Sequence, residues 1–151
     1  TGVDTLNGSA NADYLIGNNG NDILYGNGGS DILEGGNNDD YLDGGSGADV
    51  LIGGAGADTF VISTTDASDS IVDFTSAQGD ILDISNILVG WNSATDDIDD
   101  YLQFQTNGSN TIVRVDVDGL ANGTNFVEIA TLEGTTGLVV QTLYDNSQII
   151  A

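Results

Sequence analysis

Single apolar side chains recur every nine residues through the first 60 positions, separated by stretches of small and polar residues. They are Leu6, Leu15, Leu24, Leu33, Leu42, Leu51 and Phe60. Strand-forming residues such as Tyr14, Ile23 and Val50 precede them, so each apolar position predicts a strand of three residues with one side chain directed inwards. The other six residues of each unit are rich in Gly and Asn, which predicts a tight turn.

An Asp lies two residues before each of these apolar positions, and a Gly follows the first six Asp after four residues. The units therefore read, for example, GNNGNDILY and GGSGADVLI. A single unit cannot bury its apolar side chain. We expect two units to form one coil with two strands and two turns, and successive coils to bury a shared apolar seam.

This arrangement brings the Asp side chains into two stacks, because alternate units lie on the same side of a coil. One stack holds Asp4, Asp22, Asp40 and Asp58, and the other holds Asp13, Asp31 and Asp49. Two carboxylates at the strand spacing of about 4.8 Å repel by roughly 3.5 kcal/mol at an effective dielectric of 20. The stack should be unstable alone, and calcium, which binds hard oxygen ligands, would reverse the sign of these interactions. A metal-free solenoid with solvated Asp is the less favoured alternative.

The charge and the missing residue types exclude several classes of function. The 151 residues include 24 acidic residues and a single basic one, Arg114, for a net charge of −23, and there is no His, Cys, Met or Pro. Nucleic-acid binding lacks a basic patch. Zinc, haem and iron–sulfur sites, and Cys or Ser nucleophiles activated by His, lack their residues. We expect no catalytic residues, and no apolar run is long enough to span a bilayer.

The nonapeptide units resemble the RTX repeats of proteins exported by bacterial type I secretion, which fold as a calcium-bound parallel β-roll. The resemblance implies that each ion binds the second and fourth carbonyls and the Asp of one turn. The first and third carbonyls and the Asp of the turn one coil later complete its ligands. It therefore implies several Ca²⁺ ions as the cofactors of this chain.

Carried over to this sequence, the resemblance assigns five groups of candidate ligands. Two interior groups are Asn18, Gly20, Asp22, Gly35, Asn37 and Asp40, and Asn27, Gly29, Asp31, Gly44, Ser46 and Asp49. Two more are Ser9, Asn11, Asp13, Gly26, Gly28 and Asp31, and Gly36, Asn38, Asp40, Gly53, Ala55 and Asp58. A fifth consists of Gly2, Asp4, Gly17, Asn19 and Asp22, and the turn glycines Gly45 and Gly47 complete the candidates.

Segment 72–85 resembles the stretch that follows the roll in RTX proteins, where two acids close the last calcium site. Asp73 and Asp80 are the matching positions, and Asp69 is a weaker candidate. Alternatively, Asp80 and Asp83 are exposed strand residues beside a buried apolar pair.

Further along, segment 93–102 predicts a short helix capped by Ser93, with its acids forming a solvated face. Residues 111–117 and 125–131 predict two strands joined by a hairpin loop. Asp116, Asp118, Asn122 and Asn125 could bind an additional calcium there, although a plain turn is favoured because the spacing is not that of an EF-hand. Trp91, Phe104, Phe126 and Tyr144 are expected to be core or cap residues.

The C-terminal stretch from residue 127 is similar to the secretion-target region of large RTX adhesins. Together these features predict an all-β chain: a calcium-bound parallel β-roll at residues 1–63, then a β-rich capping and secretion-target region with one or two short helices at 64–151, packed as one unit. We expect a monomeric piece of a larger secreted or cell-surface protein, in contact with the type I secretion machinery during export and with neither nucleic acid nor membrane. The alternatives are an accessory domain of a secreted protease or lipase, and a surface-binding solenoid, which the irregular outward turn residues disfavour.

Overall fold

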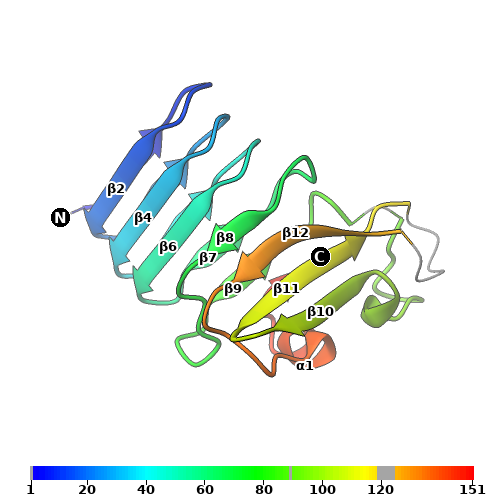
Figure 1. Ribbon diagram of the computed structural model, residues 1–151. Helices are drawn as coiled ribbons and strands as arrows, with labels where there is room; N and C mark the ends of the chain where they lie inside the picture. The colour runs from blue at the N-terminus through cyan, green and yellow to red at the C-terminus, as the bar shows by residue number, and fades with distance from the viewer. Residues whose placement is uncertain (1, 89, 119–124) are drawn as a thin grey trace.

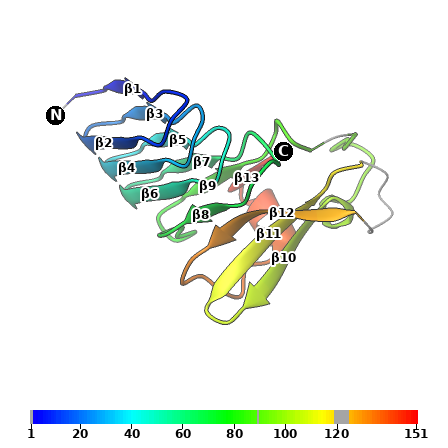
Figure 2. The ribbon, with the colours of Figure 1, turned by 45° about the horizontal axis from the view of Figure 1, so that its top comes forward.

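The computed structural model describes residues 2–88, 90–118 and 125–151, and within them the strands form two sheets (Figures 1 and 2). The six-stranded sheet has the order β1 (Thr5–Asn7), β3 (Ile23–Tyr25), β5 (Tyr41–Asp43), β7 (Thr59–Val61), β9 (Ile81–Asp83) and β13 (Ile149–Ile150). The seven-stranded sheet has the order β10 (Leu102–Asn107), β11 (Asn110–Asp116), β12 (Phe126–Leu132), β8 (Asp69–Ile71), β6 (Val50–Ala55), β4 (Ile32–Asn37) and β2 (Tyr14–Asn19).

Successive repeat strands alternate between the two sheets, as the nine-residue period predicts. Strands one coil apart pair in parallel, so that Leu24 lies beside Leu42 and Leu42 beside Phe60. In the other sheet Leu33 lies beside Leu51. These side chains are fully buried and form the apolar seam of the roll, which confirms the predicted parallel β-solenoid.

The strands of the two sheets differ in length, which the sequence pattern did not indicate. In the first sheet β3, β5 and β7 have the expected three residues, whereas β2, β4 and β6 have six. The extra residues are the first three of the following turn, which pair in register, Asn19 with Asn37 and Asn37 with Ala55. Successive turns stack at the spacing of the strands, so their backbones continue the ladder of hydrogen bonds.

The roll continues beyond the last sequence repeat. Strand β8 pairs with β6, placing Ile71 beside Leu51, and β9 pairs with β7, placing Leu82 beside Phe60. Ile71 and Leu82 are fully buried in the same seam. Both sheets therefore pass residue 63 without a break, and the coil geometry persists where the nonapeptide spacing has ended.

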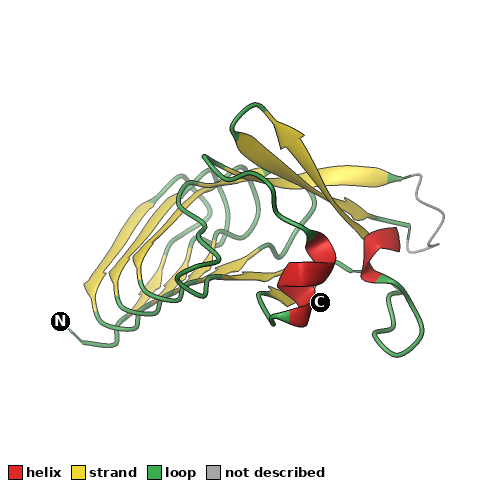
Figure 3. Cartoon of the chain, turned by 90° about the horizontal axis from the view of Figure 1, so that it is seen from below, coloured by secondary structure: helices red, strands yellow, loops and turns green. Residues whose placement is uncertain are grey.

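The C-terminal part closes the end of the roll opposite the N-terminus. Strand β12 pairs in parallel with β8 and antiparallel with β11, which in turn pairs with β10. Helix α1 (Val140–Asp145) lies at this end, and β13 pairs with β9 (Figure 3). Val113, Ile129 and Leu143 belong to the same core cluster as the leucines of the roll. The two parts thus share one core.

Segment 93–102 is not the predicted helix. In the described residues it contains a single turn of 3-10 helix, η1 (Ile98–Asp100), and its cap is Asp97, whose side chain accepts from the Asp99 N–H, so Ser93 is not the cap. The Asn92 side chain accepts from the Ala94 N–H, and Asp96 accepts from the Asn92 N–H. Such local side-chain bonds to the backbone compete with helix formation, and here they keep the segment irregular.

The hairpin expected from residues 111–117 and 125–131 is present as β11 and β12, displaced by one residue. The predicted loop residue Asn122 lies outside the described residues. The aromatic residues pack as expected. The rings of Trp91 and Tyr144 meet edge to face with their centroids 5.5 Å apart. Phe104 packs against the core cluster, and Phe126 is half-buried. None of the helices in the described residues is long and apolar enough to cross a membrane.

Candidate metal centres in the turns

The repeat Asp residues form two ladders that run along the roll. In each ladder an Asp Oδ1 accepts a hydrogen bond from the backbone N–H of the Asp one coil earlier. The donor–acceptor distances are 2.8 Å from Asp4 to Asp22, 2.7 Å from Asp22 to Asp40 and 2.9 Å from Asp40 to Asp58. The second ladder has 2.7 Å from Asp13 to Asp31 and 2.8 Å from Asp31 to Asp49. The two predicted stacks are therefore present.

The second carboxylate oxygen of the four interior Asp residues has no hydrogen-bond partner. These oxygens are the Oδ2 atoms of Asp22, Asp31, Asp40 and Asp49. Their residues are at most 3% exposed, so water does not solvate the carboxylates freely. A buried charged oxygen without a partner costs several kcal/mol, and native proteins satisfy such groups or place a cation beside them. Four such oxygens at equivalent positions indicate a repeated cation site.

Each unpartnered oxygen lies beside the glycine that begins its own turn, and those of Asp22 and Asp31 also lie close to a carbonyl oxygen from the turn one coil later. A Cβ atom added to Gly17 would lie 2.6 Å from both Asp22 Oδ2 and the Gly35 carbonyl oxygen. The same atom on Gly26 would collide with Asp31 Oδ2 and the Gly44 carbonyl oxygen. Gly17 and Gly26 thus each leave space for two oxygens from two turns, which are pairs that the resemblance assigned to one ion.

Backbone conformation explains why the turns consist of Gly and Asn. Asn18, Asn27 and Asn38 have φ of 78°, 73° and 80°, a region in which Asn is tolerated better than most residues. Gly36 has φ of 117° and lies against the Asn18 carbonyl, where a Cβ would collide. The remaining candidate glycines with positive φ are Gly20, Gly29, Gly45 and Gly47.

Several candidate carbonyls already accept one hydrogen bond from a neighbouring coil. The Asn37 carbonyl accepts from the Gly20 N–H at 3.2 Å, and the Ser46 carbonyl accepts from the Gly29 N–H at 3.0 Å. A carbonyl oxygen has two lone pairs, so one hydrogen bond leaves it able to bind a cation. The Ala55 carbonyl similarly accepts from the Asn38 N–H and the Ser9 carbonyl from the Gly28 N–H.

The N-terminal edge of the roll differs from the interior. Asp13 is half-buried, and its Oδ2 accepts from both the backbone N–H and the hydroxyl of Ser9, at 2.7 and 2.8 Å. The Asn11 N–H donates to the Ser9 hydroxyl in turn. Asp4 is exposed and contributes its N–H to Asp22. In this first coil a Ser side chain satisfies the oxygen that is unpartnered in the interior.

At the other end, both ladders continue into the segment after the repeats. Asp80 Oδ1 accepts from the Asp58 N–H at 3.1 Å, and Asp69 Oδ1 accepts from the Asp49 N–H at 3.0 Å. Asp80 is 1% exposed, so the alternative in which it is an exposed strand residue is wrong. Asp73 is placed differently, because its two oxygens accept from the N–H groups of Gly53 and Gly54.

Asp69 is the ladder residue that the sequence interpretation ranked too low. Its position could have been found from the spacing to the next buried apolar side chain. Asp69 precedes Ile71 by two residues and Asp80 precedes Leu82 by two, as Asp22 precedes Leu24. This spacing persists although the interval between successive ladder members lengthens from 18 residues to 20 and 22.

Burial favours the protonated form of these carboxylates in the absence of a cation. It raises the pKa of Asp58 to about 6 and that of Asp69 to about 7. The hydrogen bonds from the backbone N–H groups of Asp40 and Asp49 lower these two pKa values, but by less than burial raises them. Burial likewise raises the pKa of Asp40, Asp49 and Asp80. Ladder neighbours add to the shift because like charges repel. The charged form of these groups is thus disfavoured unless a cation offsets it.

Carboxylates alone do not complete a metal site here. Among the residues that the structure describes, no group of three or more acidic side chains is arranged to hold an ion. That agrees with ligand sets in which two turns give one Asp each and backbone carbonyls supply the rest. Calcium accepts such mixed shells of six to eight oxygens. The residues present therefore fit calcium in the interior turns.

Fold and turns together define the first 60 residues as an RTX-type calcium-binding repeat segment. Comparison with known families agrees, since residues 1–33 and 25–60 match the RTX calcium-binding nonapeptide repeat (4 copies). No curated protein matches the chain significantly in sequence.

Solved structures similar to nearly all of the chain include two subunits of one enzyme. One is the AlgE6R2 subunit from the Azotobacter vinelandii mannuronan C5-epimerase, with 28% identity, a TM-score of 0.53, and coverage of 95% of this chain and 90% of the other. The second is the AlgE6R3 subunit from the same enzyme, with 27% identity, a TM-score of 0.44, and coverage of 99% and 78%. The likeness to AlgE6R2 extends beyond the repeats into the C-terminal part.

Proposed function

We propose that this chain is the calcium-binding C-terminal RTX and secretion-signal region of a large secreted or cell-surface adhesin. It would be unfolded in the cytosol during type I export and folded by extracellular calcium. The observation that carries the proposal is the row of buried Oδ2 atoms without partners in Asp22, Asp31, Asp40 and Asp49. A fold that buries these charges needs a cation to be stable.

The residues of the roll would act as a switch that senses the calcium concentration. Calcium, when bound, supplies positive charge and six to eight coordination positions. Asp22 and Asp40, with the Gly35 carbonyl, would hold an ion between two coils and so tie the coils together. At the low calcium of the cytosol their mutual repulsion would keep the turns open. A site filled at a hundredfold excess over its Kd adds about 2.7 kcal/mol to the stability of the fold.

The C-terminal part would have two roles in this proposal. Residues 64–151 add a last coil with β8 and β9 and then cover the open end of the roll, which would otherwise expose unpaired strand edges. The resemblance of the stretch from residue 127 to the secretion-target region of RTX adhesins supports contact with the type I secretion machinery. We propose a roll at 1–63 and a cap at 64–151 that act as one monomeric unit, attached to the rest of a larger chain, with no nucleic-acid or membrane-inserted partner.

A second candidate is an accessory module of a secreted enzyme. The similarity to the AlgE6R2 subunit of an epimerase favours it, because that likeness covers 95% of this chain. RTX proteases and lipases would be further parents of this kind. Residues upstream in the parent chain distinguish the two: an HExxH or GxSxG motif indicates an enzyme, and tandem adhesive domains indicate an adhesin.

Replacement of the four interior Asp residues tests the proposed export switch. In the full parent chain, Asp22, Asp31, Asp40 and Asp49 are each changed to Ala, and the extracellular yield and protease resistance are measured in millimolar calcium. We expect loss of the resistant fold and reduced extracellular yield. The matched control changes the exposed Asp97, Asp99, Asp100 and Asp145 to Ala, with the same change of charge. Normal export and folding of the variant that lacks the four interior Asp residues would contradict the proposal.

A further inference from the structure

A second group of oxygen-bearing side chains lies outside the roll, at the loop end of the β11–β12 hairpin. Asp116 is the last residue of β11 and lies opposite Phe126 of β12. Its backbone N–H donates to the Tyr101 carbonyl oxygen at 2.9 Å, which fixes it between two neighbours. The residue is 0% exposed. A carboxylate is therefore buried inside the protein at the loop end of a hairpin.

One oxygen of this carboxylate has no partner. Asp116 Oδ1 accepts from the Asp118 N–H at 3.1 Å, so the carboxylate faces the chain as it leaves β11, whereas Oδ2 makes no hydrogen bond. The single basic residue, Arg114, lies two positions earlier, but its Nη2 donates to the Phe126 carbonyl oxygen at 3.2 Å. A buried charge in this state is costly unless a cation accompanies it.

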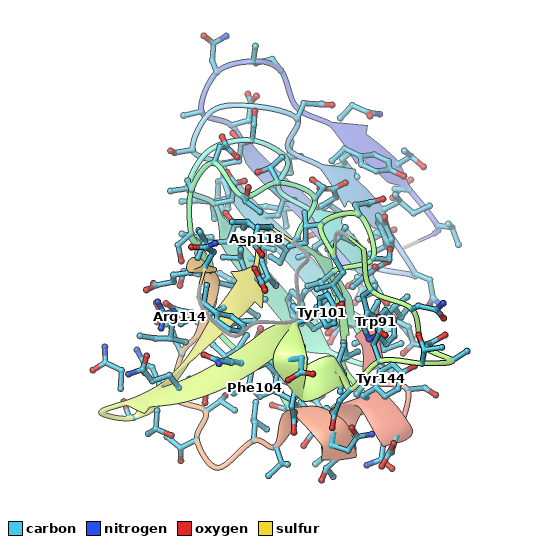
Figure 4. All side chains as sticks on the ribbon, turned by 90° about the vertical axis from the view of Figure 1, so that its right-hand side faces the viewer. Trp91, Tyr101, Phe104, Arg114, Asp118 and Tyr144 are labelled. Atoms are coloured by element: carbon cyan, nitrogen blue, oxygen red, sulfur yellow. The ribbon has the colours of Figure 1, made fainter. Side chains whose placement is uncertain are left out.

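Two further oxygen-bearing side chains meet beside Asp116. The Asn125 amide donates from Nδ2 to Asp118 Oδ2, and the Val117 N–H donates to the Asn125 carbonyl oxygen. Figure 4 shows Asp118 beyond the end of β11, with Tyr101 on the neighbouring segment. A half-turn of the Asn125 amide would direct its Oδ1 in place of its Nδ2. The carboxylates of Asp116 and Asp118 and the amide oxygen of Asn125 would then be available to one cation, together with the Asn125 carbonyl oxygen.

We propose that Asp116, Asp118 and Asn125 form a calcium site separate from those of the roll. The donors are hard oxygens and include Asp118 at the edge of a loop, an arrangement that suits the flexible coordination of calcium better than the strict octahedron of magnesium. The spacing in the sequence alone favours a plain turn. The complete burial of Asp116 and its unpartnered Oδ2 are what change that interpretation. The ion would fasten the loop end of the hairpin to the Tyr101 segment.

Counting bound ions tests this site. Native mass spectrometry of the whole chain at saturating calcium gives the number of ions, and far-UV circular dichroism follows folding of the roll in the same samples. We expect Asp116→Asn and Asp118→Asn each to bind one ion fewer than the unchanged chain, with the calcium midpoint of roll folding altered by less than about twofold. Asp99→Asn, an exposed acid of the neighbouring η1, is the matched control and should bind the full number.

The outcomes separate this inference from the proposed function. An unchanged ion count in Asp116→Asn and Asp118→Asn, while the roll still folds with calcium, overturns the hairpin site alone. If Asp116→Asn does not fold, the count in Asp118→Asn decides. Absence of any calcium-dependent folding in the unchanged chain contradicts the proposed switch, and an ion count that still falls by one in the variants would support the hairpin site independently.

Discussion

The effect of a carboxylate on folding depends on its position in the repeat, and the adjacent Asp39 and Asp40 illustrate the difference. Asp39 is exposed and accepts from the Ala57 N–H at 2.8 Å. Asp40 is buried, with one oxygen in the ladder and the other unpartnered. Burial raises the pKa of Asp40. Asp40 should therefore oppose folding without calcium and promote folding with it.

Changing Asp40 to Asn tests this dual role. Asn keeps an oxygen that can accept from the Asp22 N–H and removes the buried charge, so the variant should be more folded than the unchanged chain in chelator. It should also need severalfold more calcium to complete folding, because a charged ligand is lost. Far-UV circular dichroism with and without calcium measures both effects. Asp39→Asn is the control and should shift both far less, because Asp39 is exposed and adds only a minor like-charge contribution to the raised pKa of Asp40. Equal behaviour of the two variants would contradict the assigned roles.

Sequence reasoning identified most residues of the ladders, because a strict period links each Asp to a buried Leu two positions later. It ranked Asp69 below Asp73, since the period had ended and only the short Asp-x-Ile spacing remained. It also could not foresee that Ser9 satisfies Asp13, since that depends on the side-chain rotamer. Nothing in the spacing indicated that Asp116 would be completely buried.

At the scale of elements, the roll outlasts its repeats because strand pairing needs only an inward apolar residue and a backbone in register. Strands β8 and β9 meet that condition after loops of a different length. Elements without a period were missed: β10 has a polar exposed edge, and α1 begins at Val140 after an N-cap residue, Val139, that makes no capping side-chain bond. The predicted helix at 93–102 was wrong because its Asn and Asp side chains bond to nearby backbone groups.

The ladders also predict how metal-free folding depends on pH. The pKa of Asp58 is raised to about 6 and that of Asp69 to about 7 in the fold, above their ordinary value of 3.8. Between pH 4 and 7 the folded state therefore binds more protons than the unfolded state, and its stability falls as pH rises. In chelator, the folded fraction measured by circular dichroism should increase as pH falls from 7.5 to 5.

The variant Asp69→Asn separates this effect from the general loss of negative charge on acidification. With the buried group removed, the dependence between pH 6 and 7.5 should become shallower than in the unchanged chain. Asp99→Asn, a change at an exposed position of η1 outside the ladders, should leave the slope unaltered. A folded fraction that rises with pH in chelator would contradict the proposed cause.

On the scale of the whole molecule, roll and cap depend on each other through a continuous core. The buried Ile71 and Leu82 of the last coil belong to the same cluster as Ile129, Leu143 and Ile149 of the cap. Parallel pairing of β12 with β8 and of β13 with β9 covers the edge of each sheet at the end of the roll. The cap thus supplies the packing surface that the end of a solenoid needs.

A fragment of residues 1–63 should consequently fold less well than the whole chain. It lacks β8 and β9, which pair with β6 and β7 and place Ile71 beside Leu51 and Leu82 beside Phe60. We expect its calcium midpoint to lie at least tenfold higher, and its transition to be broader, when both are followed by circular dichroism. A fragment spanning 1–84, which adds β8 and β9, should be intermediate. Equal midpoints for the fragment 1–63 and the whole chain would show that the cap is dispensable.

The central claim is that cations at the buried Asp ladders make this fold stable. The most direct test is a calcium titration of the whole chain by far-UV circular dichroism, starting in chelator, with magnesium as the control. The account predicts a steep change from coil to β-structure with calcium only, reversed by chelator. A chain that is already fully folded in chelator at pH 7.5, with a spectrum unchanged by calcium, would contradict it.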